Sequence, residues 1–349
     1  MSPDPSAGAE RKADHLRVTL TEDVDHVGLT TGLETLRLHA RALPGSDLSA
    51  VSLASEAFGR SLGAPVLISC MTGGTSDAGP VNAALARAAQ AHGVALGLGS
   101  GRVLLEGGDP ASFQVRDLAP DVPLLANLGA VQLPELGVDG CRRLLDMTAA
   151  DGLVLHLNAV QEAVQPDGDT DFGRLLEHIE AAVAGLDVPV VVKEVGFGLA
   201  PEDIAQLLEA GVAGIDVAGA GGTNWARVEG YRDDRAGRVA AAFADWGWST
   251  LSSLRAAVAA VATDGGGGGG DVTVIASGGL RDGVDAVKAL AVGADLVGFG
   301  RRLLPAAAEG PDAASEALDV LLTQMRIAVW GVGATGPGEL GPGHLRPAD

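Results

Sequence analysis

Eight short apolar runs, each ending in glycine or a polar residue, constrain the fold of this chain more than any other feature. They cover residues 65–70, 94–98, 123–126, 152–157, 189–192, 214–217, 272–276 and 294–299. Stretches with helical spacing of apolar residues lie between them, at 80–90, 141–150, 172–184, 200–210, 251–262 and 282–291. Such alternation predicts a parallel sheet, and eight repeats close it into a barrel. We therefore expect an α/β fold, a (β/α)₈ TIM barrel with an N-terminal extension, rather than an open doubly wound sheet.

The composition agrees with strands that are buried on both faces. Hydrophobic residues make up 47% of the chain and aromatic residues only 3%, so aliphatic side chains must fill the core. We expect a flexible leader at 1–13, one barrel domain at 14–335 and a flexible tail at 336–349. The six consecutive glycines at 265–270 predict a flexible spacer at the bottom of the barrel. The long segment 221–248 predicts a lid or binding loop at its mouth.

The charge and the cysteines limit the partners and the compartment. A net charge of −21 argues against nucleic-acid binding, because few cations are available to neutralise phosphates. It indicates a solvated surface, with adaptation to salt or a basic partner as alternatives. Cys70 and Cys141 are interpreted as small core residues, and no 18-residue apolar span is visible. We expect a cytoplasmic protein with no membrane segment.

Glycine-rich turns follow the last three apolar runs, at 219–223, 277–281 and 298–301. Glycine lets backbone N–H groups approach an anion closely, and a helix beginning just afterwards directs its positive end to the same place. Ser277-Gly278-Gly279 and Gly300-Arg301 have the pattern of the phosphate site found after strands seven and eight of many barrels. The alternative is that these glycines only form turns.

Polar residues at the ends of the fourth and fifth runs suggest a second ligand. His156 and Asn158 alternate along a strand and therefore face the same side, with Glu162 one turn later. Glu162 is a candidate Mg²⁺ ligand, although it could equally be a charge at a helix start. Lys193 ends a valine-rich strand and is costly to bury without an anion, which a reduced flavin, Glu194 or another carboxylate could provide. The basic pair Arg11-Lys12 could be a solvated surface feature.

Together these segments resemble the type 2, FMN-dependent isopentenyl-diphosphate isomerase family. The resemblance covers roughly residues 11–304, and its most specific part is 156–169, HLNAVQEAVQPDGD. The other matching segments are Arg11-Lys12 with His15, 31–33, 69–74, 127–130, 192–196 and 216–225.

The resemblance implies a set of ligands and roles. FMN would be bound by Met71, Thr72, Ser100, Asn127, Lys193, Thr223, Gly279, Leu280, Arg281, Gly300 and Arg301. The prenyl diphosphate substrate would be bound by Arg11, Lys12, His15, Arg102, His156, Asn158 and Gln161. Glu162 would hold Mg²⁺, while Gln161 and Lys193 would be catalytic.

The implied reaction interconverts isopentenyl and dimethylallyl diphosphate without net redox change. NADPH would reduce FMN, and the reduced flavin would protonate the terminal alkene carbon before a proton leaves C2. Lys193 would stabilise negative charge on the flavin near N1. The Arg11-Lys12 leader would close over the diphosphate. The family resemblance also implies a homo-oligomer, a tetramer or larger.

Two departures from the family pattern bear on the substrate. Gly101 replaces the usual glutamine, which could enlarge the pocket, and Asp167 replaces a glutamate. One alternative is therefore a flavin-dependent isomerase or cyclase that acts on a longer prenyl diphosphate. Another is a 2-hydroxyacid oxidase-like enzyme, which needs a His–Arg pair that His39 and His178 do not supply from a strand end. A non-catalytic flavin or phosphate-binding module would have no use for Gln161, Glu162 and the basic leader.

Overall fold

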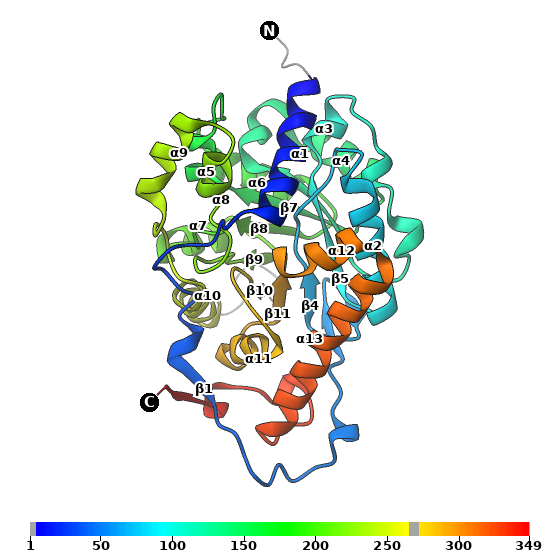
Figure 1. The fold of residues 1–349 in the computed structure, drawn as a ribbon, viewed down its shortest axis with the longest axis vertical. Coiled ribbons are helices and arrows are strands. Elements are labelled where there is room, and N and C mark those ends of the chain that lie inside the picture. Colours follow the sequence, from blue (N-terminus) through cyan, green and yellow to red (C-terminus); the bar gives the residue numbers. More distant parts are fainter. Residues whose placement is uncertain (1–4, 265–271, 349) are drawn as a thin grey trace.

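Eight parallel strands close into a barrel in the computed structural model, which describes residues 5–264 and 272–348 (Figure 1). The first barrel strand pairs with the last, with Val66 opposite Val297. Strand by strand, the expected (β/α)₈ barrel is confirmed. The strands are β4 (Val66–Ile68), β5 (Ala95–Ser100), β6 (Leu124–Gly129), β7 (Gly152–Leu157), β8 (Val190–Glu194), β9 (Gly214–Asp216), β10 (Thr273–Ala276) and β11 (Leu296–Phe299).

Helices surround the barrel at the positions that the apolar spacing predicts. These are α2 (Ala78–His92), α4 (Leu133–Thr148), α6 (Leu175–Gly185), α7 (Pro201–Glu209), α10 (Thr250–Asp264) and α11 (Gly283–Val292). Two further helices, α12 (Leu304–Glu309) and α13 (Pro311–Gly331), were not expected from the sequence; α13 packs against α2 and α11. Among the described residues, no helix is long and apolar enough to cross a membrane.

Short helices follow several strands at the mouth of the barrel. They are α3 (Arg102–Leu105), α5 (Ala159–Val164), α8 (Trp225–Gly230) and α9 (Asp234–Ala240). The segment 221–248, expected as a lid or binding loop, contains α8 and α9, and Thr223 and Trp225 line a cavity described below. The predicted glycine spacer lies outside the described residues.

Both ends of the chain differ from the sequence expectation. Residues 5–13, expected within a flexible leader, belong to helix α1 (Pro5–Thr21), which contacts α3 and α8 and so lies at the carboxyl ends of the strands. The expected flexible tail contains the 3₁₀ turns η8 (Pro337–Glu339) and η9 (Pro342–His344), followed by strand β12 (Leu345–Pro347). β12 pairs antiparallel with β1 (Leu36–Leu38), and the two lie together at the bottom of the view in Figure 1. Composition led to the expectation of a flexible tail. Composition cannot reveal that the tail forms hydrogen bonds to a strand near the other end of the chain.

The barrel interior is closed by a layer of apolar side chains. One inward-facing residue comes from each of seven strands, and these side chains pack together with little solvent exposure: Leu67, Ala95, Leu125, Val154, Val191, Ile275 and Leu296. Side chains in a strand alternate between faces, so the inward positions recur two residues later. The apolar layer therefore determines which residues face inward nearer the mouth.

Candidate active site

A ring of polar side chains lies directly above the apolar layer. Two residues beyond that layer, the inward positions are occupied by Ser69, Asn127, His156, Lys193 and Ser277. Asp216 occupies the equivalent position in β9, where it is the register partner of Lys193. Strand register alone thus places these groups together at the carboxyl ends of the strands, where TIM barrels carry their chemistry.

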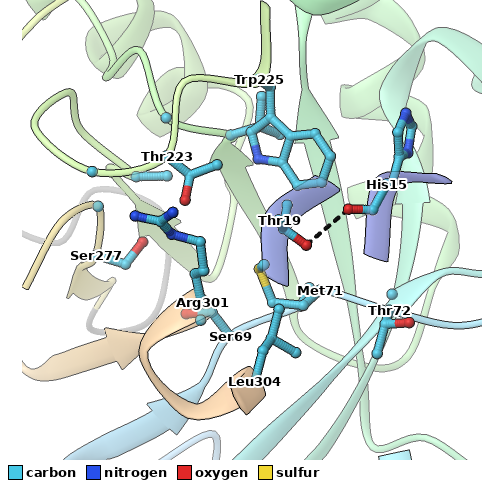
Figure 2. Close-up of a pocket in the computed structure, with 18 of the residues that line it drawn as sticks. His15, Thr19, Ser69, Met71, Thr72, Thr223, Trp225, Ser277, Arg301 and Leu304 are labelled. Atoms are coloured by element: carbon cyan, nitrogen blue, oxygen red, sulfur yellow. Dashed lines mark hydrogen bonds between the residues drawn. The ribbon is translucent and has the colours of Figure 1, made fainter. Parts of the chain in front are cut away.

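The ring borders a cavity of about 990 Å³ (Figure 2). Every residue predicted from the sequence to bind cofactor, substrate or metal lines this one cavity. These are Arg11, Lys12, His15, Met71, Thr72, Ser100, Arg102, Asn127, His156, Asn158, Gln161, Glu162, Lys193, Thr223, Gly279, Leu280, Arg281, Gly300 and Arg301. Gly101 does not line the cavity. A Cβ at this position would lie 2.3 Å from Leu144 Cδ1 on α4, so the expectation that Gly101 enlarges the pocket is wrong.

The glycine turns form a backbone cradle on one side of the cavity. Gly278 and Gly279 have φ values of 97° and 73°, a region that only glycine adopts without strain. A Cβ on Gly279 would lie 2.5 Å from the carbonyl oxygen of Gly221, so the two turns meet backbone to backbone. Within the described chain, the N–H groups of Gly279, Leu280 and Gly300 have no protein acceptor. Free N–H groups beside a cavity are suited to a phosphate.

Arginine side chains at the cradle already have carboxylate partners. Arg301 forms an ion pair with Asp25, a residue that the sequence analysis did not identify. Arg281 Nε lies 2.7 Å from Asp285 Oδ2. Asp25 forms a backbone bridge with Thr223, which holds the segment after α1 against the cradle.

Lys193 does not pair with the carboxylate of Glu194, which was one of the alternatives that the sequence left open. Its Nζ donates to the Glu194 carbonyl oxygen at 2.5 Å. Glu194 Oε2 instead accepts from the backbone N–H groups of residues 195–197 at 2.6, 2.6 and 2.5 Å. The ammonium group therefore stays at the cavity, on the opposite side from the Glu194 carboxylate.

Burial and the nearby Lys193 charge shift the pKa values of Cys70 and His156. Burial raises the pKa of the Cys70 thiol to about 11, against the opposing influence of the Lys193 charge. Cys70 lines the cavity rather than the outer core, where Cys141 is fully buried on α4. Burial, together with the charges of Lys193 and Lys12, lowers the pKa of His156 to about 3. The imidazole is therefore neutral, and its Nδ1 lies 2.9 Å from Asn127 Oδ1.

Helix α1 brings a cationic group to the opposite side of the cavity. Lys12 Nζ donates to the Ser100 carbonyl oxygen at 2.6 Å and lies 5.6 Å from the ring centroid of Phe113. Burial lowers the pKa of Lys12 to about 7, with the Arg11 charge acting in the same direction and Glu106 opposing it. A cation that is destabilised by burial in the free protein favours an anionic ligand.

Glu229 on α8 is a buried carboxylate that sequence reasoning missed. It has no solvent exposure, and its Oε1 lies 2.8 Å from His15 Nε2 and accepts from Gln161 Nε2 at 2.8 Å. Burial raises its pKa, but hydrogen bonds from His15, Gln161 and Arg232 outweigh this and lower it to about 2. Glu229 therefore fixes the side chain of Gln161. A glutamate in a short helix looks like a surface residue, so no sequence signal could have identified it.

The residues around Glu162 fit a metal ion only if a ligand shares it. Among the residues described, no group of three or more His, Cys, Asp or Glu side chains could hold a metal. Glu162 accepts from Asn158 Nδ2 at 2.8 Å and from the Asp169 backbone N–H at 2.9 Å. Mg²⁺ commonly binds one or two carboxylates, waters and substrate phosphates. Glu162 would therefore supply one carboxylate ligand to a Mg²⁺ ion, and a bound diphosphate would have to supply others.

The same cavity fits FMN. The backbone cradle suits a terminal phosphate, and Lys193 supplies a cation for an electron-rich ring. Ser69 Oγ, which is buried at the cavity, has no hydrogen-bond partner within the described residues, so a polar ligand group is needed there.

Comparisons with known proteins agree with this chemistry. The pattern of the FMN-dependent dehydrogenase family matches residues 153–347. The isopentenyl-diphosphate delta-isomerase of Synechococcus sp. is 50% identical over 323 residues, covering 91% of this chain and 90% of that protein. The enzyme of the same name from Synechocystis sp. is 47% identical and covers 92% of this chain and 90% of that protein.

Solved structures support the fold. The flavin-binding domain of baker's yeast flavocytochrome b2 has a TM-score of 0.70 at 18% identity, covering 96% of this chain and 82% of that chain. An (S)-mandelate dehydrogenase has a TM-score of 0.69 at 21% identity, covering 99% and 98%. Taken with the sequence relatives, these findings show that the chain belongs to the FMN-dependent, type 2 isopentenyl-diphosphate delta-isomerase family.

Proposed function

We propose that this protein interconverts isopentenyl diphosphate and dimethylallyl diphosphate, using FMN that NADPH keeps reduced and Mg²⁺ that the diphosphate shares with Glu162. One observation carries the proposal: a single cavity presents two separate anion sites. The glycine cradle is one, and the group formed by Arg11, Lys12, Arg102 and His156 is the other. A flavin phosphate and a substrate diphosphate would occupy them together.

The diphosphate site brings together cations from α1 and α3. Among the residues that the structure describes, the Ser100 carbonyl oxygen is the only hydrogen-bond acceptor of Lys12 Nζ. Arg102 is bound by Glu106 at 2.7 Å and Asp169 at 2.8 Å, which hold the guanidinium at the cavity edge. Mg²⁺ on Glu162 would neutralise further charge. These groups would fix the polar end of the substrate and exclude water around the alkene.

The proposed reaction is balanced as two proton transfers. The terminal alkene carbon gains a proton, and C2 then loses one, so the double bond moves without net oxidation. Reduced FMN, when bound, would supply the proton exchange and an electron-rich surface for the cationic transition state. Gln161 would lie beside the alkene with its amide fixed by Glu229, and Lys193 would hold a positive charge near the flavin.

An anaerobic assay tests this function. Purified protein with FMN, NADPH and Mg²⁺ should convert isopentenyl diphosphate to dimethylallyl diphosphate, and omitting the reductant or the metal should abolish turnover. If the reduced, Mg²⁺-loaded protein leaves this substrate unchanged, the proposal is wrong. Geranyl diphosphate, tested in parallel, addresses the alternative of a longer substrate, and lactate or mandelate addresses the oxidase alternative.

The structure does not favour the alternative in which the enzyme acts on a longer prenyl diphosphate. The position that suggested a larger pocket, Gly101, faces Leu144 instead of the cavity. We further propose that the enzyme acts in the cytoplasm as a homo-oligomer, a tetramer or larger, which sedimentation analysis of the FMN-loaded protein would test.

A further inference from the structure

Two serine hydroxyls in the wall of the cavity have no role in the proposed reaction. Ser69 follows β4 and Ser277 follows β10, and they are only 8% and 5% exposed. Gly298 of β11 lies between them: a Cβ there would be 2.6 Å from Ser69 Oγ and 2.7 Å from Ser277 Cβ. Because residue 298 is glycine, the two serines border one shared space that opens into the cavity.

Ser277 is restricted to accepting hydrogen bonds from a ligand. Its hydroxyl donates to Asp216 Oδ1 at 2.6 Å, and a serine hydroxyl has only one hydrogen to donate. The Ala218 backbone N–H donates to the same oxygen at 3.2 Å, and Lys193 is the register partner of Asp216 on the next strand. Burial raises the pKa of the Asp216 carboxyl, whereas the Lys193 charge and the hydrogen bonds from Ser277 and Ala218 act in the opposite direction and favour the carboxylate, the form in which Asp216 only accepts.

Ser69 has no hydrogen-bond partner in the described part of the chain. Its Oγ is buried and makes no hydrogen bond to any residue that the structure describes. A buried hydroxyl without a hydrogen-bond partner is unfavourable, so the site favours a ligand that satisfies it. A ligand group between the two serines must donate to Ser277 and can donate to or accept from Ser69. Phosphate oxygens and alkyl chains cannot donate, whereas the hydroxyls of a polyol do both.

The location of the serines matches the middle of a flavin nucleotide. Figure 2 shows Ser277 beside Thr223 and Arg301, and Ser69 between Arg301 and Met71. In this view Arg301, which belongs to the cradle, lies next to both serines, and Met71, which is assigned to the ring, lies beyond Ser69. A ligand that joins a phosphate to a flat ring must lay its connecting chain across this space.

We propose that Ser69 and Ser277 bind the ribityl hydroxyls of FMN, and that Asp216 is a positioning residue that makes Ser277 an acceptor. This inference rests on the proposed use of FMN. It assigns a recognition role to residues that the phosphate and ring contacts leave unexplained.

A double-mutant cycle between protein and cofactor tests the assignment. The probes are FMN and a set of FMN analogues that each lack one ribityl hydroxyl, titrated into apoprotein by quenching of flavin fluorescence. Ser277→Ala should weaken FMN binding roughly five- to tenfold, as expected for one lost hydrogen bond. The wild-type protein should already bind the analogue that lacks the contacting hydroxyl with this weakened affinity. Ser277→Ala should not weaken the binding of that analogue further.

Asp216→Asn tests the positioning role. An asparagine amide can donate to Ser277 and thereby free its hydroxyl hydrogen, so FMN binding should weaken in the wild-type background. In the Ser277→Ala background, Asp216→Asn should change FMN affinity little. Ser253→Ala is the matched control, because this serine is also fully buried but bonds to Leu199 away from the cavity. It should lower thermal stability without changing the FMN dissociation constant.

The results separate this inference from the proposed function. Normal FMN binding by wild type together with fully additive losses, or with no loss in Ser277→Ala, would overturn the ribityl assignment and leave the isomerase proposal standing. Failure of wild type to bind FMN would overturn both.

Discussion

Lys12 links diphosphate binding to proton uptake. Its pKa of about 7 in the free protein lies well below its ordinary value of 10.5, so the folded protein holds fewer protons than the unfolded chain between these pH values. The stability of the free protein should therefore rise with pH across this window as far as Lys12 contributes. A bound diphosphate restores the ammonium form, because the added negative charge favours it.

We expect inorganic pyrophosphate with Mg²⁺ to bind with uptake of about one proton near pH 8. Calorimetry in HEPES and in Tris, whose ionisation enthalpies differ, measures this number directly. Lys12→Arg, which stays charged, should bind without this uptake, and subtracting its value removes the ligand's own titration. Equal uptake by both proteins would show that Lys12 is not the titrating group.

Gly101 is a packing position, although its sequence context suggested a substrate contact. Its φ and ψ of −86° and 7° are accessible to alanine, so backbone strain does not require glycine. The space for a Cβ is occupied by Leu144 of α4. Gly101→Ala should destabilise the protein by about 1–3 kcal/mol through overcrowding, measured by denaturant unfolding.

The same change should cost less in a Leu144→Ala background, because the crowded methyl groups are gone. The ratio of activities on isopentenyl and geranyl diphosphates should stay constant in Gly101→Ala. A shift of that ratio toward geranyl diphosphate would restore the substrate-contact interpretation.

The site residues that could be predicted from the sequence are those whose direction is fixed by their place in a barrel strand. Asn127, His156 and Lys193 lie near the carboxyl ends of strands whose apolar pattern is local and unambiguous, so their shared direction follows from the alternation of side chains. Glu229 and Asp25 could not be predicted, because their importance comes from His15, Gln161 and Arg301, partners that only the fold brings near. Family resemblance identified Arg11 and Lys12, which composition alone would leave on the surface.

At the level of elements, helix α1 completes one of the two anion sites. It presents Lys12 and His15 to the cavity and is anchored by Leu16 and Val18, which are 9% and 0% exposed. The phosphate cradle is built from loops after β9, β10 and β11 and contains no part of α1. The two anion sites should therefore be separable by shortening the chain.

Deleting residues 1–13 should raise the KM for isopentenyl diphosphate at least tenfold, about the effect of losing two charge-assisted contacts, while FMN affinity stays within about twofold. Deleting residues 1–9 retains Arg11 and Lys12 and is the matched control, with a KM near that of the full chain. Loss of FMN binding on removing 1–13 would mean that α1 also forms part of the cofactor site.

Element boundaries were predicted well where a nearby glycine or polar residue ends the element. They were predicted poorly where a segment is ordered only by pairing with a distant part of the chain. Seven of the eight predicted strand ends lie within two residues of the observed ends, and the third, predicted at 126, lies three residues before the end of β6 at Gly129. The tail was expected to be flexible from its composition, yet the His39 N–H donates to the His344 carbonyl oxygen at 2.7 Å. Only the folded barrel brings those two segments together.

Across the whole molecule, the charge of the cavity opposes the charge of the chain. The chain carries a net charge of −21, whereas the cavity is lined by seven basic and four acidic side chains. Repulsion among surface carboxylates destabilises the compact state, and attraction between the cavity and a diphosphate favours binding. Salt screens both interactions, so the two properties should respond in opposite directions.

We expect that raising NaCl from about 0.01 M to about 0.15 M, which shortens the screening length from about 30 Å to about 8 Å, increases thermal stability and weakens substrate binding. The melting temperature of the FMN-loaded protein should rise by a few degrees, while the KM for isopentenyl diphosphate increases severalfold. Repeating both measurements with KCl at the same ionic strength separates screening from specific sodium effects. A melting temperature that falls with salt would show that favourable surface ion pairs outweigh the excess of carboxylates. A KM that does not change would show that buried contacts, which salt screens little, hold the diphosphate.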